Sequence, residues 1–284
     1  IPYVVAMVAA QLASAWYAQQ MSWPVFFVLA WVVGGTITHS LSLMTHELSH
    51  NLVFKTQKYN VWFGYFCNLG MGLPSCATFK RYHMEHHQYQ GADEVDVDLP
   101  TQFEGKFFRG LFWKTFFVAF QAFFYAGRPS IVRPKVMNKD ELWNYAIVFS
   151  WDAFLCYKFG LIPLLYIICS DLMGMGLHPM AGHFISEHYV FVEGHETYSY
   201  YGILNKLTWN VGYHNEHHDF PRVPGWRLPQ VREMAPEFYN NLPCYDSWTA
   251  VLWNFITDSK MTLFSRMRRG SRMSRKGGDD SKCE

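Results

Sequence analysis

The chain has 284 residues, of which 50% are hydrophobic, 18% aromatic and 17% charged. Ordinary soluble domains carry about 25% charged residues, and disordered chains carry fewer apolar residues than this one, so disorder is excluded. Twenty-four basic residues and 23 acidic residues leave a formal net charge of +1. The chain therefore lacks the basic field that recruits nucleic acid, and we expect no nucleic-acid partner.

The N-terminal region is uncharged over its first 46 residues, and Glu47 is the first charged side chain. A bilayer core about 30 Å thick takes about 20 apolar residues per helix. Residues 3–20 and 24–44 therefore predict two spans in an antiparallel hairpin, with a turn near Pro24. A secretory signal peptide fits poorly because no basic segment precedes the apolar run.

A second apolar region covers residues 142–182 and is broken at residues 158–160 and at Pro163. This pattern predicts another hairpin, with arms of about 17 to 20 residues. Basic residues near the start of the third span place that end on the cytosolic side by the positive-inside rule. These are Arg128, Arg133, Lys135 and Lys139.

Two further apolar segments do not read as regular spans. Residues 59–79 are uncharged but contain three glycines and Pro74, which favours a re-entrant or interface-lying segment. Residues 107–125 are rich in Phe and Trp yet contain Arg109 and Lys114. That pattern is typical of a helix lying in the lipid headgroup region, and a packed core helix is the alternative.

Together these patterns predict one all-α integral membrane domain with about four transmembrane helices in two hairpins and a cytosolic helical lobe, which also carries the histidine clusters described next. Its regions are residues 1–45 (first hairpin), 46–139 (cytosolic or interfacial), 140–182 (second hairpin), 183–265 (cytosolic) and 266–284 (a basic, disordered tail). The six cysteines are scattered without C-x-x-C spacing, which predicts neither disulfides nor cysteine-based zinc sites.

Three histidine clusters hold eight of the 13 histidines. The first is HELSH, whose i, i+4 spacing places both rings on one face of a helix. The second, HMEHH, and the third, HNEHH, share i, i+3, i+4 spacing, which aims their rings to one side. Neutral imidazole is the commonest metal-binding side chain, so this repetition predicts a metal centre.

HELSH also matches the H-E-x-x-H signature of zinc proteases. A catalytic zinc takes three protein ligands and keeps one open position, which would leave most of the box histidines without a role. Two metals would use all of them. Although imidazole suits both Fe and Zn, the number of ligands favours a dinuclear iron centre with open positions for O₂, and a membrane zinc hydrolase is the remote alternative.

The three boxes resemble those of membrane fatty acid desaturases and hydroxylases. The surrounding segments FKRYHMEHHQYQGADEVDVDLPT, GHFISEHYVFVEGHETYSYYG and NVGYHNEHHDFPRVPG are similar to the sphingolipid Δ4-desaturases, the dihydroceramide desaturases. The resemblance implies a multi-pass enzyme of the endoplasmic reticulum with its active site on the cytosolic side. It further implies a non-haem diiron centre, O₂ as co-substrate, and electrons from cytochrome b5 and its NADH-dependent reductase. The reaction implied is introduction of the C4–C5 double bond into the long-chain base of dihydroceramide.

The resemblance also implies which residues bind the metals. Eight ligands transfer from the boxes: His46, His50, His83, His86, His87, His214, His217 and His218. A ninth ligand precedes the third box, where His188 fits best and His183 is the second choice.

Acidic residues near the boxes are candidates for accepting the second ring N–H of ligand histidines, a common arrangement at metal sites. They are Glu47, Glu85, Glu216, Asp96 and Asp98. The substrate-binding candidates are Asp152, an ionisable group within a predicted span, together with Trp151 and Tyr198.

Two alternatives keep the same diiron site, namely a sphinganine or dihydroceramide C4-hydroxylase and another acyl-lipid desaturase. A lipid sensor or transporter with a vestigial metal site belongs to a different class. Intact histidines in all three boxes argue against it.

Overall fold

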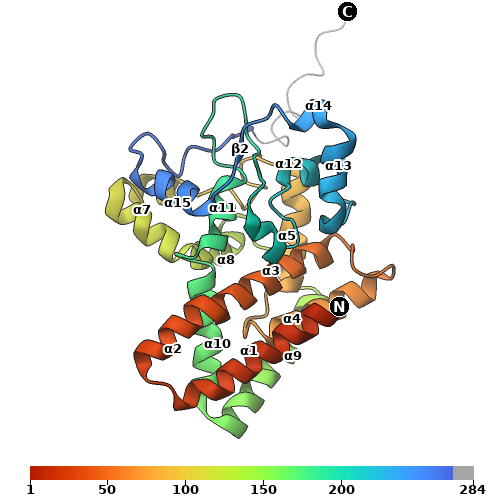
Figure 1. Ribbon diagram of the computed structural model, residues 1–284, viewed down its shortest axis with the longest axis vertical. Coiled ribbons are helices and arrows are strands. Elements are labelled where there is room, and N and C mark those ends of the chain that lie inside the picture. Colours follow the sequence, from red (N-terminus) through yellow and green to blue (C-terminus); the bar gives the residue numbers. More distant parts are fainter. Residues whose placement is uncertain (271–284) are drawn as a thin grey trace, which may run out of the picture.

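The computed structural model describes residues 1–270, and its N-terminal part is a pair of antiparallel apolar helices (Figure 1). Helix α1 (Pro2–Tyr17) leads through the short helix η1 (Ala18–Gln20) to a turn. After it, α2 (Trp23–Leu29), the π-helical η2 (Ala30–Gly34) and α3 (Gly35–Ser49) form one continuous rod. This rod has 27 residues and is about 40 Å long, more than a hydrocarbon core of about 30 Å requires. Its last turns, which carry HELSH, can therefore extend beyond the lipid.

The second hairpin consists of α9 (Lys139–Phe159) and α10 (Leu161–Gly174). Asn138 and Glu141 start α9 with reciprocal side-chain-to-backbone hydrogen bonds, the capping box. The hairpin turns at Gly160, which has a positive φ of 80°, within the break that the sequence predicted. Helix α10 then packs against the first hairpin so closely that a Cβ on Gly174 would lie 2.6 Å from the carbonyl oxygen of Gly35.

Both hairpins expose large apolar side chains, as expected for surfaces that face lipid. In the described residues, the rod Trp23–Ser49 is the single helix that is long and apolar enough to cross a membrane. The helices Leu161–Gly174 and Pro179–Ser186 meet at a bend, and together they would form a second membrane span if the pair is a single broken helix. The predicted helical hairpins are thus present, and their count of four spans stays a prediction.

Residues 59–79 were predicted to be a re-entrant or interface-lying segment rather than a regular span. They form a regular helix, α4 (Gln57–Leu69), then a turn containing Gly72 at a φ of 68°, and then the start of α5 (Cys76–Tyr89). Asn68 holds the turn, because its side-chain oxygen accepts from the backbone N–H groups of Ser75 and Cys76. The glycines thus serve the turn and the packing of a helix pair.

Residues 107–125 were expected to form one interfacial helix, but the segment is divided. Helix α6 (Gln102–Phe107) ends before α7 (Gly110–Ala119), and α8 (Gln121–Val132) follows. Lys114 does not face lipid headgroups. It is buried and donates to the backbone carbonyls of Phe255, Asp258 and Met261, so it joins α7 to the C-terminal part of the chain.

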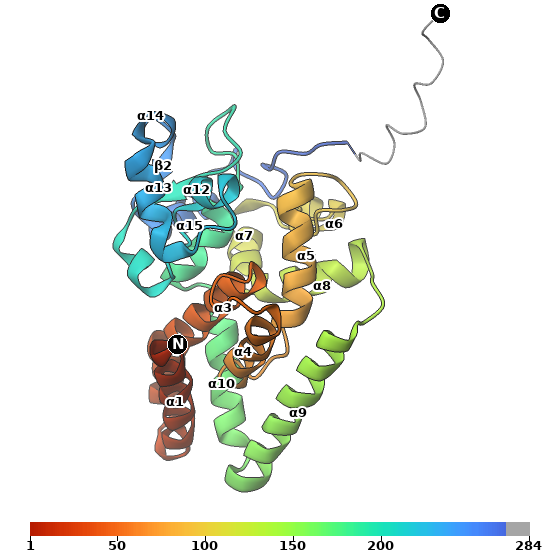
Figure 2. The same cartoon turned by 90° about the vertical axis from the view of Figure 1, so that its right-hand side faces the viewer.

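The remaining chain forms a lobe on α5 to α8, while α1, α9 and α10 extend away from it (Figure 2). Strands β1 (Ser199–Tyr200) and β2 (Cys244–Tyr245) pair in parallel, a small exception to the all-α prediction. The other elements are helical: η3 (Pro179–Gly182), α11 (His183–Ser186), η4 (Ile203–Leu207), α12 (His214–Asp219), η5 (Gly225–Arg227), α13 (Leu228–Met234), α14 (Pro236–Tyr239) and α15 (Trp248–Thr257).

The start of the predicted disordered tail is ordered. Arg266 pairs with Tyr189 through an isolated β-bridge, and Arg269 pairs with Ala92 in the same way. The prediction was therefore wrong for residues 266–270, because their backbone and guanidinium groups find partners in the lobe. The rest of the tail, residues 271–284, lies outside the described residues.

Candidate metal centre

Nine histidines converge where α3, α5 and α12 meet the loop that follows α11. The last turn of α3 provides HELSH, α5 provides the second box, α12 consists almost entirely of the third box, and the loop provides His188. Helix α3 ends there because Asn51 adopts a left-handed conformation, with a φ of 60°. Asn tolerates that conformation better than most residues. Segments more than 100 residues apart are thus brought to one point.

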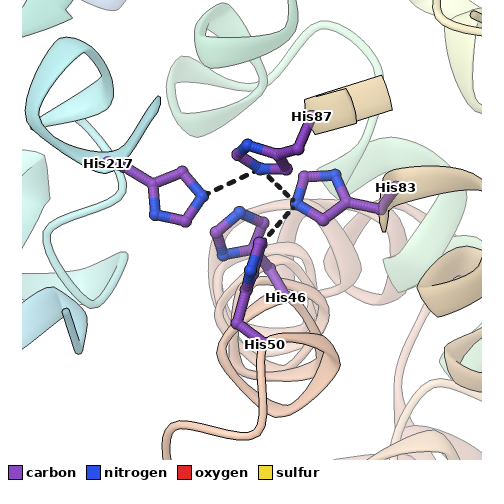
Figure 3. Close-up of side chains that lie close together, drawn as sticks. All are labelled: His46, His50, His83, His87 and His217. Carbon is purple, nitrogen blue, oxygen red and sulfur yellow. Dashed lines mark hydrogen bonds between the residues drawn. The ribbon is translucent and has the colours of Figure 1, made fainter. Parts of the chain in front are cut away.

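The first histidine group contains five side chains whose ligand nitrogens lie within 4.8 Å of one another (Figure 3). The Nε2 atoms of His50 and His83 are 2.9 Å apart, and those of His83 and His87 are 3.1 Å apart. The Nε2 atom of His217 lies 3.1 Å from that of His87. The fifth ring, His46, has a buried Nε2 without a hydrogen-bond partner.

The second group contains His86, His188 and His218, whose nitrogens also lie within 4.8 Å of one another. His188 stands between two helices, because its Nε2 is 3.0 Å from that of His86 on α5 and 3.0 Å from that of His214 on α12. His214 is therefore the fourth member. The structure brings together all eight box histidines and His188.

Each H-x-x-H-H box divides its rings between the two groups, although the spacing predicted that they would point to one side. In α5, His83 and His87 join the first group and His86 joins the second. Adjacent helical positions differ by about 100° in direction, so the rings at i+3 and i+4 separate. In α12, His217 joins the first group, whereas His214 and His218 belong to the second.

The donor set fits metal ions because several nitrogen lone pairs face one another. Asp96 Oδ1 lies 3.0 Å from Nδ1 of His86, and the carbonyl of Glu196 lies 3.3 Å from Nδ1 of His188. Carbonyls and carboxylates accept, so Nδ1 of His86 donates and its Nε2 presents a lone pair. Nδ1 of His188 lies 3.3 Å from Gln90 Nε2 as well, and in the tautomer that donates to Glu196 its Nε2 also presents a lone pair. A proton shared between the Nε2 atoms of His86 and His188 would satisfy only those two. The Nε2 atom of His218 is a third nearby nitrogen, which is buried and has no hydrogen-bond partner. A cation satisfies all three.

Burial keeps most of these rings neutral, the form that binds metals. Desolvation first, and then nearby charge on His46 and Lys80, lower the pKa of His50 to about 3. Burial first, and then neighbouring imidazoles, lower the pKa well below the ordinary value for His83, His188, His214, His217 and His218. His86 differs, since Asp96 outweighs the effect of burial and raises its pKa, which also makes it a more basic ligand.

Among the predicted acidic partners, Asp96 contacts a ligand histidine most directly. It is 1% exposed, and its carboxylate also accepts from the backbone N–H groups of Gly91 and Asp98. Glu47 Oε1 lies 3.8 Å from Nδ1 of His46, while its other oxygen accepts from the Gly225 N–H. Asp96 therefore orients a ring, and Glu47 ties α3 to the segment that follows the third box.

The other predicted acidic partners bond elsewhere. Glu216 accepts from the hydroxyl groups of Ser199 and Tyr201, so it anchors α12 to β1 and its neighbour. Glu85 pairs with Arg133 and Lys135. Asp98 pairs with Arg266. Position within or near a box thus does not decide whether a carboxylate reaches a histidine.

His183 lies apart from both groups. Its Nδ1 is 2.9 Å from the carboxylate of Glu187, and its ring packs edge-on against that of His39. Sequence reasoning missed Glu187, whose Oε1 also approaches Nδ1 of His214 to 3.7 Å. The i, i+4 spacing of His183 and Glu187 was the available signal.

The substrate-binding candidates lie away from the histidines or are fully bonded. The Tyr198 hydroxyl donates to backbone carbonyls in the loop of residues 192–195 and accepts from the Val192 N–H, so it closes that loop. Trp151 packs against the apolar contact between α1, α2 and α10. Asp152 lies beside it on α9, and one of its carboxylate oxygens is buried without a partner.

A fatty acid desaturase family model matches residues 21–248, a stretch that contains all nine histidines. The chain therefore belongs to the fatty acid desaturase family. This confirms the resemblance that the histidine boxes indicated.

Within that family, the chain is similar to sphingolipid desaturases from animals and plants. It is 50% identical to mouse sphingolipid delta(4)-desaturase DES1 over 94% of this chain and 83% of the relative. It is 49% identical to bovine sphingolipid delta(4)-desaturase/C4-monooxygenase DES2, with the same coverage. A rice protein, sphingolipid delta(4)-desaturase DES1-like, is 50% identical over 94% of this chain and 81% of its own length.

Proposed function

We propose that the protein is an O₂-dependent sphingolipid Δ4-desaturase that converts dihydroceramide to ceramide. The observation that carries the proposal is the convergence of nine imidazoles in two groups, in a chain about half identical to sphingolipid delta(4)-desaturases. An unactivated C–H bond needs a strong oxidant, which no side chain provides and which metals with O₂ can supply.

Two iron ions are the proposed cofactor. The first would be held by His46, His50, His83, His87 and His217, and the second by His86, His188, His214 and His218. Bound there, they would supply oxidation of an alkyl chain by O₂. A single catalytic zinc would use three ligands, and the number of converging histidines therefore favours iron over the zinc hydrolase.

The protein's own residues hold and orient the site. Asp96 fixes the ring of His86, and Glu216 holds α12, which carries three ligands, against Ser199 and Tyr201. Most of the nine rings are buried, which excludes water from the reacting centre. Such placement favours attack on one carbon of a bound chain over its neighbours.

The reaction needs two electrons and two protons in addition to O₂, because two hydrogens leave the substrate and two waters form. We propose cytochrome b5 and its NADH-dependent reductase as the electron donors. The location that suits them is the endoplasmic reticulum membrane, with the metal site on the cytosolic side. The long Trp23–Ser49 rod supports this arrangement, since it leads from an apolar segment directly to the site.

A C4-hydroxylase is the second candidate, and the similarity to bovine DES2, whose name includes C4-monooxygenase, favours keeping it. Both outcomes start with removal of one hydrogen from the chain. Small differences in substrate position then decide between a second removal and transfer of oxygen.

Expression in cells that lack sphingolipid Δ4-desaturase activity tests the proposal. Dihydroceramide should lose two hydrogens, and fragmentation should place the new double bond between C4 and C5. Gain of one oxygen at C4 would establish the hydroxylase. Products confined to acyl-CoA or glycerolipid chains would reject a sphingolipid substrate while leaving an acyl-lipid desaturase.

A further inference from the structure

Residues 262–270, called here the C-terminal strap, contact two of the three segments that hold the second histidine group, namely the loop of His188 and the loop that follows α5. Beside His188, the Val190 N–H donates to the carbonyl of Ser265 over 2.9 Å. Beyond the end of α5, the Arg269 N–H donates to the carbonyl of Gly91 over 2.6 Å, and the Asp93 N–H donates to the carbonyl of Arg269 over 3.1 Å. The strap therefore joins the loop of His188 to the loop that follows His86.

Arg266 is the buried side chain of the strap. Its side chain is 2% exposed, its Nη2 donates to Asp98 Oδ2 over 2.7 Å, and its guanidinium carbon lies 5.2 Å from the ring centre of Tyr189. Tyr189 directly follows His188 in the sequence. One guanidinium thus contacts a carboxylate near the second box and the residue next to the ninth histidine.

Asp98 connects Arg266 to the ring of His86 through Asp96. Its backbone N–H donates to Asp96 Oδ1 over 3.0 Å, and the same oxygen lies 3.0 Å from Nδ1 of His86. The sequence of contacts is Arg266, Asp98, Asp96 and His86. A shift of Asp98 would change the one carboxylate that sets the orientation of this ring.

Arg128, the other buried arginine nearby, does not duplicate this role. It donates to the carbonyl of Asp98, but its ion pair is with Glu104. Among the described residues, Arg266 is the cation within ion-pair distance of the Asp98 carboxylate. Removal of its charge leaves that carboxylate, whose side chain is 28% exposed, without its ion-pair partner.

We propose that Arg266 is a positioning residue for the second metal, acting on His86 through Asp98 and Asp96 and on His188 through Tyr189. The proposal rests on the two-metal assignment made under the proposed function. It gives the start of the basic C-terminal segment a specific role at the metal centre. Within residues 1–270 the strap makes no such contact with the first group, so the effect is confined to one metal.

The test is the iron content of the purified, intact protein, measured by mass spectrometry for Arg266→Ala, His188→Ala and the double variant. Arg266→Ala should reduce iron from about two to about one per chain, as His188→Ala does, because both affect the same group. The double variant should lose no more than either single one. Full retention of iron in Arg266→Ala, or a further loss in the double variant, would overturn the proposal.

Arg268→Ala is the matched control, since Arg268 lies on the same strap and pairs with Asp93, whose side chain is 43% exposed. It should retain both irons. Equal loss in Arg268→Ala would show that any damage to the strap has this effect and would overturn a specific role for Arg266. A wild-type protein without two irons would instead refute the diiron assignment, so the two failures are distinguishable.

Arg266→Lys covers the case in which Arg266→Ala does not fold. Lysine keeps the charge but lacks the planar fork that contacts Asp98. The variant should purify with both irons and then release one of them to a chelator several times faster than the wild type. Release at the wild-type rate would contradict the proposal.

Discussion

The two histidine groups use the same kind of ligand but are built on different supports. All five members of the first group lie on or at the end of regular helices, α3, α5 and α12. In the second group, His188 lies on a loop, and His86 depends on Asp96 in another loop. Helices hold side chains more rigidly than loops do. We therefore expect the second metal to be bound less tightly and to respond more strongly to substitutions around it.

The largest expected effect is that of His188→Ala. The side chain lies 3.0 Å from both His86 and His214, so its removal takes the central nitrogen from the second group. Desaturation should fall below detection, and about half of the bound iron should be lost. His183→Ala is the control, because His183 belongs to neither group, although its partner Glu187 lies 3.7 Å from His214. Loss of iron in His183→Ala and not in His188→Ala would reverse the assignment of the ninth ligand.

Asp96→Asn should have the next largest effect. The amide keeps the shape but loses the charge that makes His86 a basic ligand, and such substitutions cost roughly 10 to 100-fold in metal affinity or activity. Chelator competition would measure the affinity of the second site. An unchanged second site would show that the contact at 3.0 Å has no influence on the metal.

Glu216→Ala should destabilise the protein, because α12 loses the acceptor for the buried hydroxyl of Ser199 and the partly buried hydroxyl of Tyr201. The expected loss is about 1–3 kcal/mol for each unsatisfied group, and a lower unfolding temperature in detergent would report it. Glu216→Gln retains one acceptor oxygen and should lose less. Equal stability of the alanine variant and the wild type would contradict the anchoring role.

Glu85→Gln should have the smallest effect. Glu85 lies inside the second box but pairs with the partly exposed Arg133 and Lys135, and exposed ion pairs contribute about 0–1 kcal/mol. Iron content and activity should match the wild type. A loss comparable to that of Asp96→Asn would show that box position decides the role of an acid.

Much of the histidine centre could be predicted from the sequence, because the i, i+3 and i+4 spacings fix which rings share a helix face. The 100° between adjacent helical positions separates the ring of His86 from that of His87, but which rings share a metal depends on where α12 lies across from α5, and spacing does not show this. His188 has no local spacing pattern, and it was assigned through resemblance. Asp96 and Glu85 look equivalent in sequence, but Asp96 lies in a turn that folds back toward His86.

The helices were predicted better than their surroundings. The break at residues 158–160 follows from local charge and glycine, and it coincides with the turn between α9 and α10. Lys114 was predicted to lie in a helix at the lipid headgroups, because it is a charged residue in an aromatic segment. Arg266 was predicted to lie in a disordered tail, because it begins a run of basic residues. Their partners are distant in sequence, and no local pattern indicates them.

The most direct test of the account is the metal content of the wild-type protein, expressed with both iron and zinc available and purified without added metal. Two histidine groups predict about two irons per chain. Removal of iron by a chelator should abolish conversion of dihydroceramide, and iron with a reductant should restore it. One zinc per chain without iron would contradict the diiron account.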